Sequence, residues 1–189
     1  MLPKANYAKL LKAIQFASEK HKHQKRKGKE GVPFINHPIQ VANILSETAA
    51  ITDENLLMAA ILHDTIEDTQ TYPEEIELLF GNEVKRLVLE VTDDMSLPCQ
   101  ERKRLQIINA KALSSKAKLL RIADKICNVK DILYSPPSWS TQRKLEYLNW
   151  AEEVVVQIEN IHPGLNKLFN SYLAKSRQEL AKMYVLEQN

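Results

Sequence analysis

The segment 59–68 joins an apolar run to a group of ionisable side chains. An apolar stretch with the pattern of a buried helix ends at the adjacent pair His63 and Asp64, and carboxylates follow at Glu67 and Asp68. Burying an imidazole and a carboxylate at the end of such a helix costs several kcal/mol unless something pairs them, and a metal cation is the strongest partner. If the helical turn continues, Glu67 and Asp68 share a face with Asp64. The segment therefore indicates a metal site flanked by further carboxylates.

Two more polar residues stand in apolar helical patterns elsewhere in the chain. The four side chains at the ends of, or inside, apolar helices are His37, His63, Asp64 and Asp124. Two imidazoles and two carboxylates make a borderline-hard ligand set that suits Mn²⁺, Fe²⁺ or Mg²⁺, with zinc as a further option. The alternative is a set of separate local roles. His37 would then cap a helix. Asp124 would form an ion pair with Lys125 or Arg121.

Such a metal site suits the hydrolysis of a phosphate ester. A divalent ion lowers the pKa of a bound water, so that hydroxide is available near neutral pH, and it neutralises phosphoryl oxygens. A nearby carboxylate can accept the proton of the water, which typically raises the rate by about 10²–10⁴-fold. Two basic regions, Lys20–Lys29 and Arg102–Lys125, would offset the charge of a polyphosphorylated substrate. Arg26 and Lys27 lie closest to the loop before His37, whereas the preceding lysines equally suit a solvated surface.

The first two helices begin and end at recognisable signals. Residues 6–21 carry apolar side chains at helical spacing and predict an amphipathic helix. The glycines and the proline within 28–33 then predict a loop. Pro38 suits the first turn of the next helix, where its missing N–H costs nothing, and this places His37 at a helix N-terminus.

The middle helices follow the same rules. Thr52 or Asp53 caps a third helix that is apolar nearly all round and is therefore expected to be central and buried. Pro73 starts a further helix, Gly81 ends it, and Asn82 is expected to cap the next.

The helix that carries Asp124 is capped by Ser114 or Ser115. Asn128 lies one turn beyond Asp124 on the same face of this helix. The segment 135–138, with two prolines, ends the helix, and two more amphipathic helices follow.

Composition and length favour one all-α domain. The chain has 189 residues, of which 44% are hydrophobic and 26% are charged, as is ordinary for a globular protein. Only four glycines and few strand-like patterns are present, so we predict a single helical domain over residues 1–189. No apolar run approaches the ~20 residues of a membrane helix. Cys99 and Cys127 form no disulfide framework, which suits a reducing compartment such as the cytoplasm.

The order His, then His-Asp, then Asp resembles the HD phosphohydrolase superfamily. The flanking segments resemble the hydrolase domain of the RelA/SpoT alarmone enzymes, especially the stand-alone small hydrolases of the metazoan SpoT homolog type. The matching stretches are 26–27, 33–38, 60–69, 80–81, 91–94, 101–103, 120–128 and 146–147 with Trp150. Departures are small: Phe34 stands where many relatives carry tyrosine, and Cys127 stands where others carry histidine or tyrosine.

This resemblance implies an all-α HD-domain bundle of roughly eight to ten helices that binds a single Mn²⁺ ion. The implied metal ligands are His37, His63, Asp64 and Asp124. Glu67 and Asp68 match the catalytic pair that orients and deprotonates the attacking water. The implied substrate contacts are Arg26 and Lys27 for the guanine face and the phosphates, Asn128 for the ribose, and Tyr147 near the phosphates.

The activity that the resemblance implies is Mn²⁺-dependent removal of pyrophosphate from the 3′-position of ppGpp or pppGpp, which yields GDP or GTP. The expected partner is then a nucleotide, with no nucleic acid and no membrane, and a homo-oligomer is allowed. A second interpretation keeps the site but changes the substrate, for example to the 2′-phosphate of NADPH. A third is a non-catalytic nucleotide sensor or nucleic-acid-binding module that uses the basic stretch and releases no phosphate.

Overall fold

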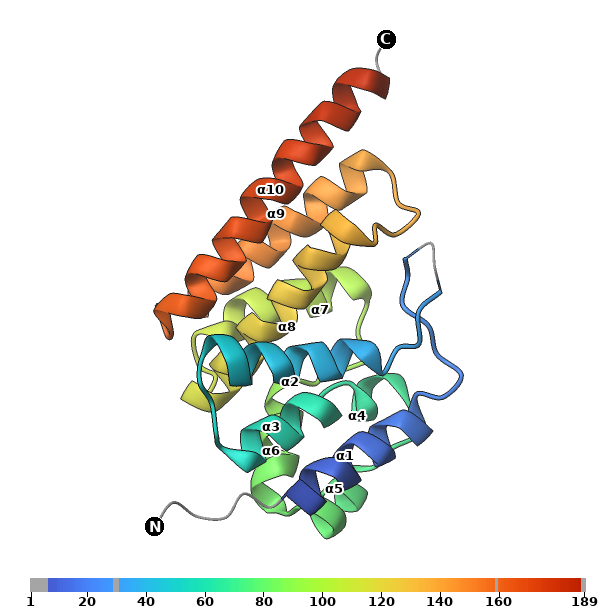
Figure 1. Ribbon diagram of the computed structural model, residues 1–189, viewed down its shortest axis with the longest axis vertical. Coiled ribbons are helices and arrows are strands. Elements are labelled where there is room, and N and C mark those ends of the chain that lie inside the picture. Colours follow the sequence, from blue (N-terminus) through green and yellow to red (C-terminus); the bar gives the residue numbers. More distant parts are fainter. Residues whose placement is uncertain (1–6, 29–30, 159, 188–189) are drawn as a thin grey trace.

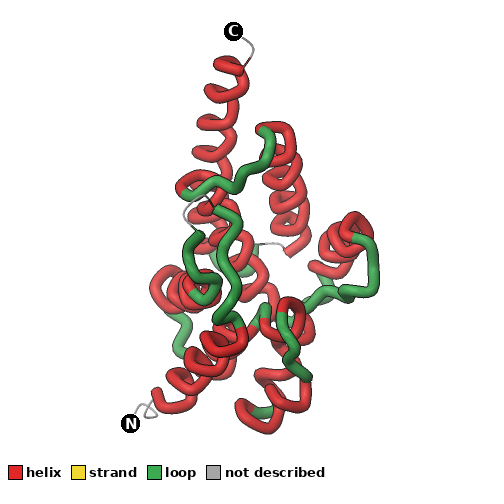
Figure 2. The backbone as a smooth tube through the Cα atoms, turned by 90° about the vertical axis from the view of Figure 1, so that its right-hand side faces the viewer, coloured by secondary structure: helices red, strands yellow, loops and turns green. Residues whose placement is uncertain are grey.

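The structure, a computed structural model, describes residues 7–28, 31–158 and 160–187. Its helices are α1 (Tyr7–Lys20), α2 (Asn36–Thr48), α3 (Glu54–Leu62), α4 (Thr65–Asp68), α5 (Pro73–Phe80), α6 (Asn82–Val91), α7 (Cys99–Ala110), α8 (Ser115–Tyr134), α9 (Thr141–Ile158) and α10 (Pro163–Glu187). The described ranges contain no strand, as the trace in Figure 2 shows. The predicted all-α class and helix number are therefore confirmed. Asn6 and Lys29, which belong to predicted segments, lie outside the described residues.

Helix α8 lies at the centre of the bundle. It packs against α2, α3, α6, α9 and α10, and Figure 1 shows α10 running along α8 and α9 over much of the length of the molecule. Apolar residues on several sides of α8, including Leu120, Ile122 and Ile126, have no exposed surface. Because α8 is surrounded, any charged side chain in its middle must find a partner inside the protein.

Helix starts follow the sequence signals with one exception. The Asp53 side chain accepts a hydrogen bond from the Leu56 N–H, and Ser114 caps α8 by accepting from the Ala117 N–H. Asn82 was expected to cap the helix after Gly81, and this is wrong: α6 begins at Asn82 and its N-cap is Gly81. Gly81 has a φ of +96°, which glycine adopts without steric cost.

The apolar helix α3 ends where the first pair of ionisable residues begins. His63 is the C-cap of α3, and Asp64 is the N-cap of the single-turn helix α4. The Thr65 side chain is buried and donates to the carbonyl of Leu62, which stabilises the change of direction between the two helices. The helical turn therefore continues past Asp64, but along a new axis.

A loop between α1 and α2 closes against the α8–α9 connection. Lys25 pairs with Pro33 across this loop, and Gly28 pairs with Pro137. A Cβ at residue 28 would lie 2.8 Å from the carbonyl oxygen of Ser135, so only glycine allows this approach without displacement. The loop is thereby held over the same face of the molecule as the C-terminal half of α8.

None of the helices in the described part of the chain combines the length and the apolar character that crossing a lipid bilayer requires.

Candidate metal and substrate site

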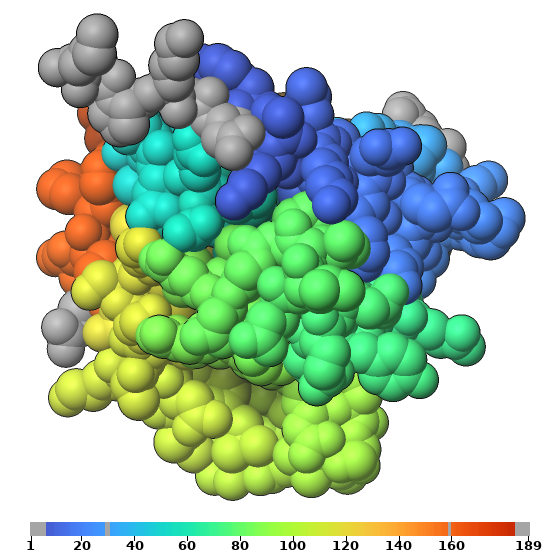
Figure 3. All heavy atoms as spheres, turned by 90° about the horizontal axis from the view of Figure 1, so that it is seen from below, coloured from blue at the N-terminus to red at the C-terminus, as the bar shows by residue number. Residues whose placement is uncertain are grey.

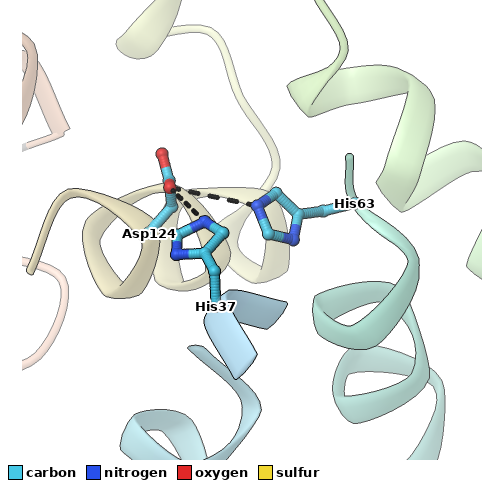
Figure 4. A group of neighbouring side chains, drawn as sticks. All are labelled: His37, His63 and Asp124. Atoms are coloured by element: carbon cyan, nitrogen blue, oxygen red, sulfur yellow. Dashed lines mark ion pairs between the residues drawn. The ribbon is translucent and has the colours of Figure 1, made fainter. Parts of the chain in front are cut away.

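Three side chains from three helices converge in the interior. His37 comes from the first turn of α2, His63 from the end of α3, and Asp124 from the middle of α8 (Figure 4). His37 Nε2 lies 3.2 Å and His63 Nε2 lies 3.9 Å from Asp124 Oδ1. One ligand atom from each residue lies within 4.8 Å of the other two. Donors so close together can hold a single cation.

Asp64 lies beside both imidazoles, outside the three residues whose ligand atoms are all within 4.8 Å of one another. Its Oδ1 lies 3.1 Å from His63 Nε2, and its Oδ2 lies 3.5 Å from His37 Nε2. The structure therefore brings together all four residues that the sequence singled out. The N-cap of α2 is Ile35, so His37 is not the helix cap of the alternative interpretation, whereas the ion pair between Asp124 and Lys125 that this alternative also named is present.

The tautomer of His63 suits a metal ligand. His63 Nδ1 lies 2.8 Å from the carbonyl oxygen of Ala60, which can only accept, so Nδ1 carries a proton, and the lone pair of the neutral imidazole is on Nε2. His63 Nε2 is buried without a hydrogen-bond partner in the described part of the chain, as is Nδ1 of His37. Once His63 is neutral, its buried Nε2 faces two carboxylates, which is an environment that a divalent cation fits.

The charges of these groups depend on one another. Burial alone would lower the pKa of His63, but the Asp64 and Asp124 carboxylates outweigh it and raise this pKa to about 9. Burial would raise the pKa of Asp64, whereas His63 and His37 hold it at about 2. Lys125, together with the two imidazoles, holds the pKa of Asp124 well below its usual range despite burial. Both carboxylates are therefore ionised at neutral pH, ready to bind a cation.

Glu67 and Asp68, the predicted catalytic pair, lie on α4 beside the four clustered residues and line the same cleft. Glu67 Oε2 accepts a hydrogen bond of 2.9 Å from the Asp93 N–H. Burial and the neighbouring Asp93 charge raise the pKa of Glu67 to about 7. A carboxylate with such a pKa can exchange protons near neutral pH. The pKa of Asp68 is raised as well, by desolvation and by the charge of Asp64.

The predicted substrate residue Arg26 is held by α8. Its Nε donates to Asp131 Oδ2 over 2.9 Å, and its Nη2 donates to Asn128 Oδ1 over 2.9 Å. The Asn128 Nδ2 group in turn donates to Asp124 Oδ1 over 2.6 Å. The guanidinium lies over the Phe34 ring, 5.6 Å from its centroid. Sequence reasoning missed Asp131, which lies one turn beyond Asn128 and whose spacing could have revealed it.

Lys27 also lines the cleft, and its side chain is exposed. The remaining predicted residue, Tyr147, lies on the opposite wall. Its ring packs 5.7 Å from Trp139 and 5.2 Å from Trp150, measured between centroids. Burial raises the pKa of the Tyr147 hydroxyl, so it stays protonated and can donate a hydrogen bond. Trp139 carries the guanidinium of Arg143 over its ring, and neither residue was singled out from the sequence.

These residues surround one cleft of about 880 Å³. His37, His63 and Asp124 line its floor. Basic residues line both of its sides, with Lys25, Arg26 and Lys27 on the loop and Arg102, Lys103, Arg121, Lys125 and Arg143 on α7, α8 and α9. A cleft of this size, with metal-binding and acidic residues around its floor and basic residues along its sides, suits a phosphorylated small molecule that binds together with a cation. A separate, smaller hollow lies between the end of α6 and α7 and is lined by Glu90, Asn109 and Ala110 among others; Figure 3 shows a recess between the green and the lime surfaces of these helices.

The HD domain family matches residues 13–149, and the chain belongs to this family. The chain is 55% identical over 149 residues to the guanosine-3′,5′-bis(diphosphate) 3′-pyrophosphohydrolase MESH1 of Xenopus tropicalis, a match that covers 78% of this chain and 83% of that protein. It is 49% identical over 171 residues to the MESH1 protein of Homo sapiens, with coverage of 90% and 95%.

A solved structure superimposes on the chain with a TM-score of 0.87 and 44% sequence identity, covering 89% of this chain and 95% of the other. That structure is described as a metazoan ortholog of SpoT that hydrolyses ppGpp and plays a role in starvation responses. The resemblance to the stand-alone RelA/SpoT-type hydrolases, inferred above from separate motifs, is therefore confirmed. The imidazole nitrogens of His37 and His63 and the carboxylate of Asp124 form a ligand set that suits a divalent cation.

Proposed function

We propose that this protein is a metal-dependent 3′-pyrophosphohydrolase of guanosine-3′,5′-bis(diphosphate). The observation that carries the proposal is the convergence of two imidazoles and two carboxylates at the floor of a cleft with basic residues along its sides. The relatives that cover most of the chain carry the name of this activity. Hydrolysis would convert ppGpp to GDP, or pppGpp to GTP, and release pyrophosphate.

His37, His63, Asp64 and Asp124 would hold the cation, for which we propose Mn²⁺. When bound, a divalent cation supplies Lewis-acid activation of water and neutralises phosphoryl charge. The Glu67 carboxylate would accept the proton of the attacking water, and the Asp93 N–H that bonds Glu67 Oε2 would keep it oriented. Asp68 lies on the same helical turn and would help to position the water.

The protein would hold the nucleotide by its base, its ribose and its phosphates. The Arg26 guanidinium, fixed in place by Asp131, offers a flat cationic surface on which a purine ring can stack. Asn128 bonds both Arg26 and Asp124 and would contact the ribose. Lys27 and the Tyr147 hydroxyl would contact phosphates.

One assay with purified protein tests this function. Metal-depleted protein is incubated with ppGpp alone and with added Mn²⁺, Mg²⁺ or Zn²⁺, and pyrophosphate release is followed together with the metal content. We expect stoichiometric release of GDP and pyrophosphate with Mn²⁺ and none without a cation. Asp64→Ala is the matched negative control, because it removes one carboxylate from the site.

Parallel incubations separate this function from its alternatives. Faster release of phosphate from NADPH than of pyrophosphate from ppGpp would reassign the substrate. No turnover of either, combined with salt-sensitive binding to polynucleotides, would indicate a binding module instead.

The proposal also covers the compartment, the partners and the oligomeric state of the enzyme. We propose a single domain that works in the cytoplasm on a small-molecule nucleotide, without nucleic acid or membrane, as a monomer or a homo-oligomer. Both cysteines carry free thiols, with Cys127 buried, which agrees with a reducing compartment. Light scattering during gel filtration determines the oligomeric state.

A further inference from the structure

Lys125 is a buried cation for which the proposed reaction has no role. Its side chain is 3% exposed, in the centre of α8. Its Nζ lies 3.1 Å from Asp124 Oδ2 and 4.4 Å from the centroid of the Trp150 ring. An ammonium group is costly to bury unless it is paired, so the carboxylate on one side and the indole on the other account for its position.

Trp150 is itself held in place from two directions. Its indole N–H donates to the carbonyl oxygen of Lys103 on α7 over 3.0 Å. Its ring packs on Tyr147 of α9, with the centroids 5.2 Å apart. The indole therefore presents a fixed aromatic face to the Lys125 ammonium, which such a face attracts. Helices α7 and α9 thus determine where this charge lies relative to Asp124.

The two oxygens of Asp124 have different partners as a result. Oδ1 accepts from the Asn128 amide over 2.6 Å and lies 3.2 Å from His37 Nε2. Oδ2 is paired with Lys125. In Figure 4 both dashed lines from the imidazoles meet the same carboxylate oxygen, while the other points away. A carboxylate can bind a cation through one or both of its oxygens, and here only one is directed at the site.

We propose that Lys125, held against Trp150, is a positioning residue that keeps Asp124 a one-oxygen ligand. The inference rests on the proposed metal site and adds a role that the ligand set alone does not define. By occupying Oδ2, Lys125 leaves one more coordination position for water or a phosphate oxygen. Its positive charge also opposes the cation and limits how tightly the site binds it.

The test replaces Lys125 by methionine, which has a similar unbranched length and no charge. Mn²⁺ affinity is measured by competition with a chelator, and the number of water molecules on bound Mn²⁺ is measured by water-proton relaxation. We expect Lys125→Met to bind Mn²⁺ about tenfold more tightly, because a nearby positive charge is gone. We also expect one fewer water on the ion and slower turnover of ppGpp, because Asp124 can then bind through both oxygens.

Lys103→Met is the matched control. It removes the same charge from the same cleft, and the Lys103 ammonium lies 5.1 Å from the same Trp150 ring. Lys103 is not an ion-pair partner of Asp124 in the structure, so Mn²⁺ affinity should change by less than about twofold and the water count should stay the same. An equal effect of both variants would overturn the inference, because it would reflect the charge of the cleft alone.

The test also requires that Lys125→Met folds. Circular dichroism and thermal unfolding with bound Mn²⁺ establish that Lys125→Met is folded. If it is not, Trp150→Phe carries the test, because it loses the hydrogen bond to α7 and should likewise lower the water count. Weaker Mn²⁺ binding by folded Lys125→Met, or an unchanged water count in the variant tested, overturns the inference alone. Failure of the wild-type protein to bind Mn²⁺ overturns the proposed function, and this inference with it.

Discussion

The floor and the rim of the cleft use the same kinds of charged residue in different surroundings. At the floor, the His37, His63 and Asp124 side chains are almost completely buried and lie against opposite charges. At the rim, Lys27 and Glu146 are exposed residues on the α1–α2 loop and on α9. A buried charge that loses its partner is not compensated, whereas water and salt compensate an exposed one. We therefore expect substitutions at the floor to affect the chemistry and substitutions at the rim to affect affinity.

The largest effect is expected for Asp124→Ala. Asp124 is the one proposed metal ligand that α8 supplies, and its Oδ1 lies close to both imidazoles. The variant removes this shared carboxylate. We expect loss of stoichiometric Mn²⁺ and of detectable ppGpp hydrolysis, measured by metal analysis and by pyrophosphate release. Asp94→Ala is the control, because Asp94 is exposed and its side chain bonds Ser96. Turnover by Asp124→Ala would show that the ligand set is wrong.

Glu67→Ala should separate catalysis from metal binding. Because the Glu67 carboxylate bonds the Asp93 N–H and is not one of the four proposed ligands, we expect Mn²⁺ to remain bound while kcat falls by about 10²–10⁴-fold. Burial raises the pKa of this carboxyl to about 7, and the base must be ionised. The wild-type rate should therefore rise with pH up to about pH 7. A bound cation favours the ionised carboxylate, so it should move the end of this rise to a lower pH.

The pH profile of Glu67→Ala provides a second readout. The variant should lack the rise in rate that wild type shows, because the titrating base is gone. Loss of Mn²⁺ from the variant would instead identify Glu67 as a ligand.

Metal binding should release a proton from His63. The Asp64 and Asp124 carboxylates overcome the effect of burial and raise this pKa to about 9, yet an imidazole binds metal only when neutral. Apparent Mn²⁺ affinity should rise by up to about tenfold per pH unit below pH 9 and level off above it. Calorimetry in buffers of different ionisation enthalpy measures the released proton, and an affinity independent of pH would contradict the assignment.

In the metal-free protein, the raised pKa of His63 makes the free energy of unfolding fall as the pH rises. A pKa raised on folding stabilises the native state fully below the unfolded value of about 6.5, and this contribution is lost as the pH rises to about 9. Unfolding of the metal-free protein at several pH values should show this loss, and bound Mn²⁺ should reduce it.

The smallest effects are expected at the rim, where Arg26 and Lys27 are adjacent but differ in their contacts. Arg26 is fixed by Asp131 and Asn128, so Arg26→Ala should raise KM for ppGpp by about tenfold with a smaller change in kcat. Lys27 is exposed, so Lys27→Ala should raise KM by about threefold at low salt and less at high salt. Equal, salt-independent effects would remove the distinction between the two residues.

The parts of the site that could be predicted from the sequence are those that violate a local pattern. His63 and Asp64 interrupt an apolar helix, and Asp124 interrupts another, so each requires a partner wherever it lies in space. Pro38 and Pro73 mark helix starts because their geometry is locally determined. Such residues can be recognised without knowledge of the contacts that they make.

The parts that could not be predicted depend on contacts between distant segments. The spacing of Asp131, one turn beyond Asn128, places it on the same face of its helix, but its bond to Arg26 from another part of the chain could not be predicted from that spacing. Lys125 was considered only as a local partner of Asp124, whereas its position also depends on Trp150. The wrong assignment of Asn82 as a cap has a local cause, since glycine at a positive φ can start a helix without a side-chain hydrogen bond.

The close approach of Gly28 to Ser135 has a consequence for engineering the enzyme. We expect a methyl group at residue 28 to push the α1–α2 loop, and with it Arg26 and Lys27, away from Ser135 in the α8–α9 connection and so to widen the entrance, while the four proposed metal ligands lie outside both segments. Gly28→Ala and Gly28→Val thus offer a graded series for admitting bulkier nucleotides. Substrate range and metal chemistry could then be altered independently in this scaffold.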